Sequence, residues 1–256
     1  MPDRKLLPGK FVWFELVTRD AKKAQAFYGE VLGWKVQPFS MGDSTYEMIT
    51  IGEGMDSMIG GYAMPKDERQ PSHWISYVSV EDVDAAAKAA TANGGRIVEP
   101  PYDIPQVGRT ARIADPQGAE LCLFRNASGD PDDALPPRGG WCWNELHTTD
   151  ATKAIAFYEK VVGFSHRTLS GPAGTYHILS RGGVDRGGVT DQGSAQPSWL
   201  PYVAVDDADA TVARARNNGG KVCVGPEDIP GVGRFGVLQD PTGASFAVLK
   251  PLPKGV

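Results

Sequence analysis

The chain has 256 residues, which is enough for two domains that each bury a core of their own. Its formal net charge is −5 and its lysines and arginines are dispersed, so a nucleic-acid or anionic-membrane partner is not expected. We expect a cytoplasmic protein, because no signal peptide or membrane span of roughly 20 apolar residues is visible and three cysteines without CxxC spacing fit a reducing compartment.

Residues 11–18 begin the predicted structure with a strand, because their side chains alternate with a period of two. At Asp20 the period changes, and apolar residues recur three and four positions apart as far as Leu32. Thr18 or Asp20 can cap this helix, and Gly33 fits the left-handed residue at its end. The sequence therefore predicts a strand followed by a helix that packs on a sheet.

The order of a strand, a helix and further strands then occurs a second time. Residues 46–51 and 55–62 are predicted as short strands, and residues 74–80 as the strand that opens a second module. A helix starts near Asp82 and ends at an Asn-Gly-Gly sequence. Further short strands are predicted at residues 96–99, 110–113 and 120–124.

A long internal repeat is the most informative feature of the chain. The sequence FVWFELVTRDAKKAQAFYGEVLGWKV at residues 11–36 matches WCWNELHTTDATKAIAFYEKVVGFSH at residues 141–166, and the later motifs NGG, DIPxVGR and DPxGA also recur. Because this period far exceeds that of solenoid repeats, it indicates two copies of one domain. We predict a first domain at residues 1–126, a Pro- and Gly-rich linker at 127–140 and a second domain at 141–256.

The repeated segments resemble the vicinal-oxygen-chelate superfamily, which includes glyoxalase I, bleomycin-binding proteins, fosfomycin-resistance proteins and extradiol dioxygenases. The carrying motifs are TRDAKKAQAFYGEVLGW and TTDATKAIAFYEKVVGF, the two NGG helix ends and the DPQG and DPTG turns. The resemblance covers nearly the whole chain and is strongest to two-domain glyoxalase-like proteins. It implies an α+β fold of tandem duplicated glyoxalase-like domains, each built from two βαβββ modules that form a curved mixed sheet around a cleft. It further implies an intramolecular pseudo-dimer, and a further homo-oligomer stays open.

The family also implies where a divalent metal would bind, and the residues at those positions argue against one. Tryptophan, isoleucine, leucine and alanine offer no lone pair to a metal, and a single cysteine cannot form a site. No metal and no cofactor is therefore expected at the usual positions. The family's three ligand positions fall on Trp13, Ile75 and Cys122 in the first half, and on Trp143, Leu200 and Ala247 in the second.

A different metal site in the second half is the alternative. Glu145 and His147 are two positions apart on one strand and therefore share a face. His177 lies on the next predicted strand and could add a third ligand. The competing interpretation is that these are ordinary polar residues, which we prefer because the chain has only four histidines.

Aromatic residues and one carboxylate per half are predicted to line each cleft. Indole and phenol rings provide flat walls with a polar edge, which suits a small aromatic or hydrophobic molecule. Glu15 and Glu145 are the candidate catalytic residues, since a buried carboxylate can act as a general base. The predicted ligand-binding residues are Trp13, Tyr46, Trp74, Tyr77, Trp143, His147, Tyr176, Trp199, Tyr202, Arg109 and Arg234.

Structural roles compete with binding at several of these positions. Trp74 and Trp199 would in that case seal the sheet against a helix. The two arginines of the IPxVGR segments would order their loop by bonding to carbonyl oxygens or to Asp82 and Asp207, or would pair with the glutamates, rather than clamp an anionic ligand. The structural role is preferred for the arginines and for Trp74 and Trp199. A place in the cleft is preferred for the other two tryptophans and for the two glutamates.

The sequence predicts binding of a small aromatic or hydrophobic metabolite or xenobiotic without the usual metal. The first alternative is a glyoxalase-like lyase or isomerase that uses a cleft carboxylate with an atypical metal or none. The second is a structural or interaction protein whose clefts are filled by their own aromatic side chains. Superfamily folds host both enzymes and binding proteins, so the fold alone does not choose among these.

Overall fold

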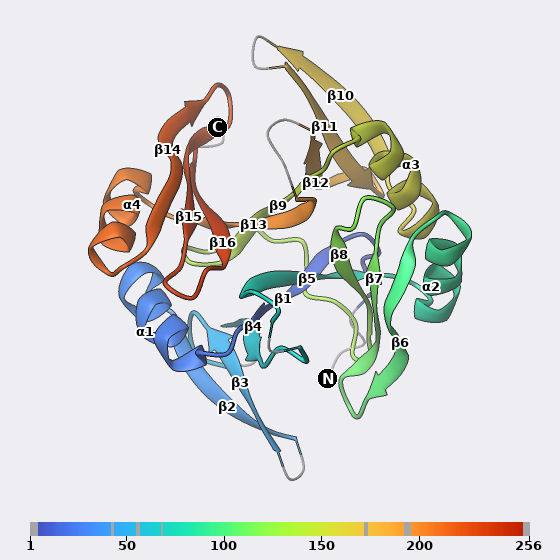
Figure 1. Ribbon diagram of the computed structural model, residues 1–256, viewed down its shortest axis with the longest axis horizontal. Helices are drawn as coiled ribbons and strands as arrows, with labels where there is room; N and C mark the ends of the chain where they lie inside the picture. The colour runs from blue at the N-terminus through green and yellow to red at the C-terminus, as the bar shows by residue number, and fades with distance from the viewer. Residues whose placement is uncertain are drawn as a thin grey trace. The chain divides into compact units, whose positions relative to one another are not determined.

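The computed structural model describes residues 5–41, 44–54, 57–67, 69–171, 174–191 and 196–252. The described residues form sixteen strands and four helices, which Figure 1 shows as four repeats of a helix with its strands. The strands belong to two mixed sheets of eight, one from each half of the chain. This arrangement confirms the predicted α+β class and the βαβββ modules.

The first sheet has the strand order β2-β3-β4-β1-β5-β8-β7-β6. β1 is parallel to β4 and β5 to β8, whereas β2, β3 and β4 pair antiparallel, as do β6, β7 and β8. Its elements are β1 (Phe11–Val17), α1 (Ala21–Leu32), β2 (Lys35–Met41), β3 (Ser44–Thr50), β4 (Met58–Ala63), β5 (His73–Ser79), α2 (Val83–Ala92), β6 (Arg96–Ile104), β7 (Gly108–Ala114) and β8 (Glu120–Asn126).

The second sheet repeats this order as β10-β11-β12-β9-β13-β16-β15-β14. β9 is parallel to β12 and β13 to β16, which reproduces the pattern of the first half. Its elements are β9 (Trp141–His147), α3 (Ala151–Val161), β10 (Ser165–Gly171), β11 (Gly174–Arg181), β12 (Val184–Thr190), β13 (Ser198–Ala204), α4 (Ala208–Asn217), β14 (Lys221–Ile229), β15 (Gly233–Gln239) and β16 (Ser245–Pro251).

An aspartate caps the start of each of these four helices. The carboxylate accepts a hydrogen bond from the backbone N–H three residues later, at 2.9–3.0 Å, which satisfies a donor that the helix leaves unpaired. The prediction of Asp20 as a cap is confirmed, and Gly33 ends α1 in the left-handed conformation. The four capping residues are Asp20, Asp82, Asp150 and Asp207.

Two strands differ from the prediction. The sequence pattern does not predict β2, because this edge strand contains Pro38 and its side chains are mostly exposed, so it lacks an apolar stripe. β6 continues to Ile104, well beyond the predicted end at residue 99. Met55, at which another strand was predicted to start, lies outside the described residues.

Contacts divide the chain into two compact units that do not follow the two halves. The first, here called the α2–α3 unit, contains Ile75–Asp133 and Trp143–Trp199 together with the stretch that ends at Trp13. The second, the α1–α4 unit, contains Phe14–Trp74, Ala134–Cys142 and the stretch that begins at Leu200. Each unit therefore combines one module of each half, and the predicted domain boundaries stay a prediction.

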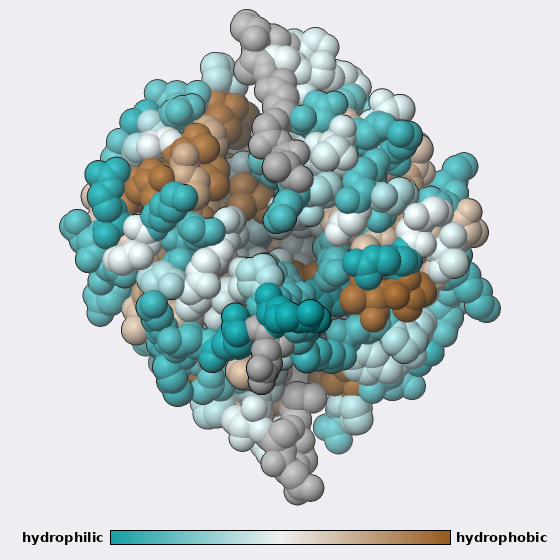
Figure 2. All heavy atoms as spheres, in the orientation of Figure 1, coloured by the Kyte–Doolittle hydropathy of each residue, from teal (hydrophilic) through white to brown (hydrophobic). Residues whose placement is uncertain are grey.

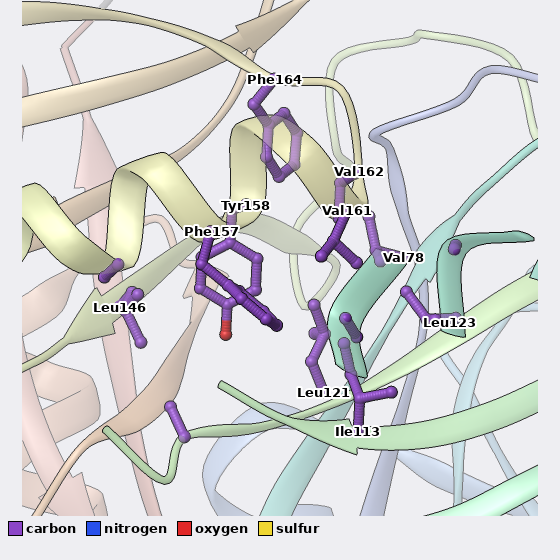
Figure 3. Packing of buried hydrophobic residues seen from close by; sticks show 14 of the residues in the cluster. Val78, Ile113, Leu121, Leu123, Leu146, Phe157, Tyr158, Val161, Val162 and Phe164 are labelled. Carbon is purple, nitrogen blue, oxygen red and sulfur yellow. The ribbon is translucent and has the colours of Figure 1, made fainter. Parts of the chain in front are cut away.

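The core of the α2–α3 unit shows how modules of different halves pack. α2 and α3 are in contact, and the buried cluster combines α3 of the second half with β7 and β8 of the first. Figure 3 shows Phe157 and Val161 of α3 facing the strands that carry Ile113 and Leu121. These side chains are at most 6% exposed, so neither half supplies the whole core by itself.

The surface is mostly polar on the face that Figure 2 displays, with separate apolar patches. One patch overlies β14 and β15, which together with their connection expose Val224 and Val232. Scattered apolar residues of this kind are normal on a globular protein. None of the helices in the described ranges has the length and hydrophobicity that a membrane-spanning helix requires.

Candidate functional site

The first half holds its candidate glutamate with a tyrosine from a different strand. Glu15 on β1 lies opposite Gly61 on β4, and Tyr46 belongs to β3 on the far side of β4. The Tyr46 hydroxyl donates to Glu15 Oε1 at 2.7 Å. The structure therefore brings together two of the residues that the sequence predicted for this site.

The second half repeats the arrangement, and an indole contacts its tyrosine. Tyr176 on β11 donates to Glu145 Oε2 at 2.7 Å, and the Trp143 indole N–H donates to the same hydroxyl at 2.9 Å. Burial, followed by the negative charge of Glu145, raises the pKa of Tyr176 well above its ordinary value. The tyrosine is therefore a neutral donor that fixes the orientation of the carboxylate.

Glycines make this geometry possible, and they are not among the site residues predicted from the sequence. Gly61 and Gly188 lie between the strand of the tyrosine and the strand of the glutamate. A β-carbon at either glycine would overlap the tyrosine hydroxyl, so only glycine lets the ring cross the intervening strand. The sequence feature that could have identified these glycines is a Gly-Gly pair that recurs in both halves, at residues 60–61 and 187–188.

His147 distinguishes the second site from the first. Its Nε2 lies 2.8 Å from Glu145 Oε1, on the same face of β9. His177 lies elsewhere, because it follows Tyr176 directly on β11 and so points to the opposite face of the sheet. Its Nδ1 contacts Thr168 Oγ1 at 3.0 Å, so the alternative metal set of Glu145, His147 and His177 is not assembled.

Trp74 and Trp199 are core residues. Each is 5% exposed, and its indole N–H donates to a buried tyrosine, at 2.9 Å to Tyr28 and 3.0 Å to Tyr158. These contacts match the predicted structural role, in which the indole packs between the sheet and a helix, and not the predicted role in ligand binding. Both indole N–H groups are therefore occupied inside the fold.

The remaining aromatic candidates differ in exposure. Tyr202 is 5% exposed, and its backbone carbonyl accepts a hydrogen bond from the Cys142 thiol at 3.4 Å. Trp13 and Tyr77 are half-buried, and the Tyr77 ring packs edge-on against Phe124 at 6.0 Å between centroids. Their roles in binding stay predictions.

Arg109 and Arg234 brace their strands against neighbouring helices. Arg109 donates to both carboxylate oxygens of Asp84 at 2.6 and 2.8 Å and to Asp103 at 2.9 Å. These hydrogen bonds raise the pKa of the Arg109 guanidinium and lower the pKa of Asp84. Arg234 holds Asp209 in the same bidentate geometry and approaches Asp228 at 3.2 Å.

Asp82 was one of the predicted partners of Arg109, and the structure gives Asp84 instead. Asp82 already caps α2 by accepting the backbone N–H of Ala85, so its carboxylate is committed to the helix end. Asp84, one step inside the helix, faces the arginine instead. The same correction applies in the second half, where Asp207 is the cap and Asp209 is the partner.

The family's metal positions hold side chains that do not fit a metal. Ile75, Leu200 and Ala247 are apolar and at most 7% exposed, and Trp143 uses its indole N–H as a donor. Cys122 is the only sulfur among the six positions. Within the described ranges, no three His, Cys, Asp or Glu side chains form a group that could hold a metal ion.

The clearest hollow in the α1–α4 unit lies away from these residues. It has a volume of about 340 Å³ and is flanked by a second hollow of about 150 Å³ beside the same residues of α1 and α4. None of the predicted site residues lines either hollow. The larger one is lined by Glu30, Val31, Leu32, Gly33, Ile51, Arg138 and Arg214.

Known proteins resemble this chain over most of its length. CFP32 of Mycobacterium tuberculosis, which carries a provisional glyoxylase name, is 38% identical over 247 residues, covering 94% of this chain and 95% of CFP32. The anthracycline biosynthesis protein DauV of Streptomyces sp. strain C5 is 29% identical over 263 residues, covering 96% of this chain and 94% of DauV.

Solved structures share the fold at lower identity. The Mn(II)-bound glyoxalase from Novosphingobium aromaticivorans matches with a TM-score of 0.65 at 18% identity, over 96% of this chain and 84% of that chain. The 2,3-dioxygenase LapB from Pseudomonas sp. KL28 matches with a TM-score of 0.63 at 14% identity, over 99% and 95% of the two chains. At these identities the likeness concerns the fold alone.

The family assignment rests on the sequence as well as on the fold. The Glyoxalase/Bleomycin resistance protein/Dioxygenase superfamily model matches twice, at residues 10–123 and 143–248, once in each half. The two matches agree with the internal repeat and with the two eight-stranded sheets. This chain therefore belongs to the Glyoxalase/Bleomycin resistance protein/Dioxygenase superfamily.

Proposed function

We propose that the protein binds a small aromatic or hydrophobic molecule at the repeated tyrosine–glutamate sites, without the metal that is usual in the superfamily. The observation that carries this proposal is the geometry found in both halves. A tyrosine crosses a glycine strand and fixes a glutamate at 2.7 Å. The carboxylate is thereby oriented to accept a hydrogen bond from a ligand.

The chemistry around the carboxylates supports an aromatic ligand. Trp143 and Tyr176 place two rings beside Glu145, and such rings offer large apolar contact area with a polar edge. The apolar side chains at the family's metal positions support binding without a Lewis acid. A relative named for anthracycline biosynthesis points to the same ligand class, since anthracyclines are polycyclic aromatic compounds.

Ligand titration monitored by tryptophan fluorescence tests this proposal. We expect aromatic compounds to quench the emission of the wild-type protein and to do so with metal chelator present. Tyr46→Phe and Tyr176→Phe should each weaken the affinity of their own site roughly tenfold, because the carboxylate loses a charge-assisted hydrogen bond. Tyr102→Phe on the exposed strand β6 is the matched control and should keep wild-type affinity.

Two outcomes would contradict the proposal, one concerning ligand binding and one concerning the absence of a metal. Absence of quenching by every compound of the panel at millimolar concentration contradicts the proposal. Stoichiometric metal in the purified protein that is lost in Glu145→Gln contradicts the metal-free part of it. Separate measurements of affinity and metal content keep these two failures apart.

A lyase or isomerase that uses Glu15 or Glu145 as a base is the second candidate function. The observation in its favour is that the glutamates are held by tyrosines, as a general base must be held to act on a bound substrate. A relative at 38% identity with a provisional glyoxylase name supports the same candidate. Turnover of a methylglyoxal–thiol adduct that survives chelator and is lost in the Glu145→Gln variant would favour it over binding alone.

Cellular location and assembly remain proposals beside the binding function. We propose a cytoplasmic protein with no nucleic-acid partner, in line with its acidic charge and the absence of a basic run in the sequence. Cell fractionation tests the location. Sedimentation of the purified protein over a range of concentrations tests whether the chain forms a further homo-oligomer.

A further inference from the structure

The two repeated sites differ at one position that changes their chemistry. Two residues beyond the glutamate, the first half has Val17 and the second half has His147. The Glu145 and His147 side chains are 12% and 28% exposed, and their nearest polar atoms are 2.8 Å apart. At this position only the second site places an imidazole, whose two ring nitrogens can donate or accept hydrogen bonds, beside its carboxylate.

The short contact favours one tautomer of the imidazole. Nε2 of His147 lies 2.8 Å from Oε1 of Glu145, and a hydrogen on Nε2 makes this contact attractive, whereas lone pairs on both atoms would repel. In this tautomer Nδ1 keeps its lone pair. A carboxylate orients the histidine base of hydrolytic triads by the same logic, with the two nitrogens exchanged.

The surroundings hold this pair in place. Oε2 of Glu145 accepts the Tyr176 hydroxyl at 2.7 Å, so the carboxylate is held on its other side. His147 lies opposite Thr190 in the register of β9 and β12. The Nε2 contact is short but is not aligned as a hydrogen bond to any described residue, and a small rotation of the ring would align it.

We propose that the second site takes aromatic compounds with an acidic hydroxyl and removes the hydroxyl proton, whereas the first site binds such compounds with the proton retained. This inference rests on the proposed binding function and names its ligand class. The ligand O–H bond breaks, an N–H bond forms at His147 Nδ1, and the electron pair stays on the ligand oxygen. Glu145 then faces an imidazolium, which its charge stabilises.

Spectroscopy with para-nitrophenol tests the inference, because only its phenolate absorbs visible light. At a pH where most of the free compound carries its proton, we expect wild-type protein to bind part of it as the coloured phenolate. His147→Val copies the first half, and should lower the ratio of bound phenolate to bound phenol about tenfold, equivalent to one pKa unit of the ligand. Calorimetry measures total binding in the same samples.

His166→Gln is the matched control. His166 also contacts a glutamate, with Nδ1 2.7 Å from Glu159 Oε1, but this pair is exposed and lies outside the proposed site. We expect this variant to keep the wild-type colour and affinity. Glu145→Gln should lose the colour, since an amide does not stabilise the imidazolium.

The possible outcomes separate this inference from the binding proposal. Binding of para-nitrophenol with the wild-type colour retained in the His147→Val variant overturns the inference and leaves binding intact. Binding without any coloured species, or no binding of para-nitrophenol while other aromatic compounds bind, also overturns it. Failure of the whole aromatic panel overturns the binding proposal as well. Circular dichroism of each variant verifies that the fold is retained.

Discussion

At the scale of single residues, the motifs that identify the repeat prove to be structural. Tyr28 accepts the Trp74 indole N–H and donates to Asp240 Oδ2 at 3.0 Å, and Tyr158 links Trp199 to Asp115 in the same way. Each chain of hydrogen bonds joins a helix of one half to the DPxG turn of the other. The motif residues thus couple the two halves.

Removing a hydroxyl from this chain should be costly. Tyr28→Phe leaves a buried indole N–H and an oxygen of the Asp240 carboxylate without a partner, so we expect a loss of about 1–3 kcal/mol in the free energy of unfolding. Tyr62→Phe is the control, because it removes the hydroxyl of another buried tyrosine and leaves the Trp74–Tyr28–Asp240 hydrogen bonds in place. Urea unfolding with equal midpoints for Tyr28→Phe and wild type would contradict this role.

The glycine that lets Tyr176 cross β12 gives a second residue-scale prediction. Gly188→Ala should displace the tyrosine ring, because the new methyl group occupies the position of its hydroxyl. We expect a destabilisation of about 1–3 kcal/mol, as in other overpacked sites. The affinity of the second site for an aromatic ligand should also fall, and titration calorimetry measures it. Unchanged affinity would show that the Tyr176–Glu145 contact is not needed for binding.

The cysteines should differ in reactivity according to burial. Burial raises the pKa of the Cys142 thiol to about 12, so hardly any reactive thiolate exists at pH 8. Cys122 is buried and Cys223 is exposed. We expect one fast-reacting thiol in the native protein and three after unfolding, measured with a chromogenic thiol reagent. Cys223→Ser should abolish the fast phase, and rapid labelling of Cys142 would refute the assignment.

At the scale of elements, α1 contains a residue of low helix propensity, Gly29. This residue lies inside the helix, and a β-carbon there would meet only the Trp34 carbonyl oxygen at an ordinary 3.6 Å. Gly29→Ala should therefore stabilise the protein by about 0.5–1 kcal/mol through helix propensity. Thermal unfolding measures the gain. A lower Tm than wild type would mean that the site is more crowded than the structure indicates.

At the scale of the whole molecule, the covalent halves and the packed units differ. The α2–α3 unit buries α3 of the second half against β7 and β8 of the first, and its Tyr158–Asp115 hydrogen bond crosses the same boundary. A half expressed alone would expose this apolar face to water. The linker is therefore not the only connection between the halves.

Cutting the linker should leave the halves associated. We expect a protease site inserted after Leu135, a residue that is 70% exposed, to be cleaved without loss of co-elution in size-exclusion chromatography. The non-covalent cores then hold the pieces together. Separation of the pieces at micromolar concentration in native buffer would contradict the intertwined arrangement. Uncleaved protein with the same insertion serves as the control.

The sequence by itself determined the duplication, the α+β class, the start of each predicted helix and the family. These follow from local patterns, since periodicity, capping residues and turn motifs act within a few neighbouring positions. It also predicted that Glu15 and Tyr46 line one cleft and that Glu145 and Tyr176 line the other, and each pair is in contact in the structure.

Only the tertiary structure decided what these residues contact. Trp74 and Trp199 are buried by contacts with tyrosines that are distant in sequence. Arg109 pairs with Asp84 and not with Asp82, and this choice depends on how β7 packs beside α2. His177 is kept apart from Glu145 because its side chain lies on the other face of the sheet, beside Thr168. The edge strand β2 also depends on tertiary structure. Its sequence has no alternation of apolar and polar residues, and it is a strand because it pairs with β3. Cross-strand and helix–sheet contacts carry no local signature, so packing alone fixes them.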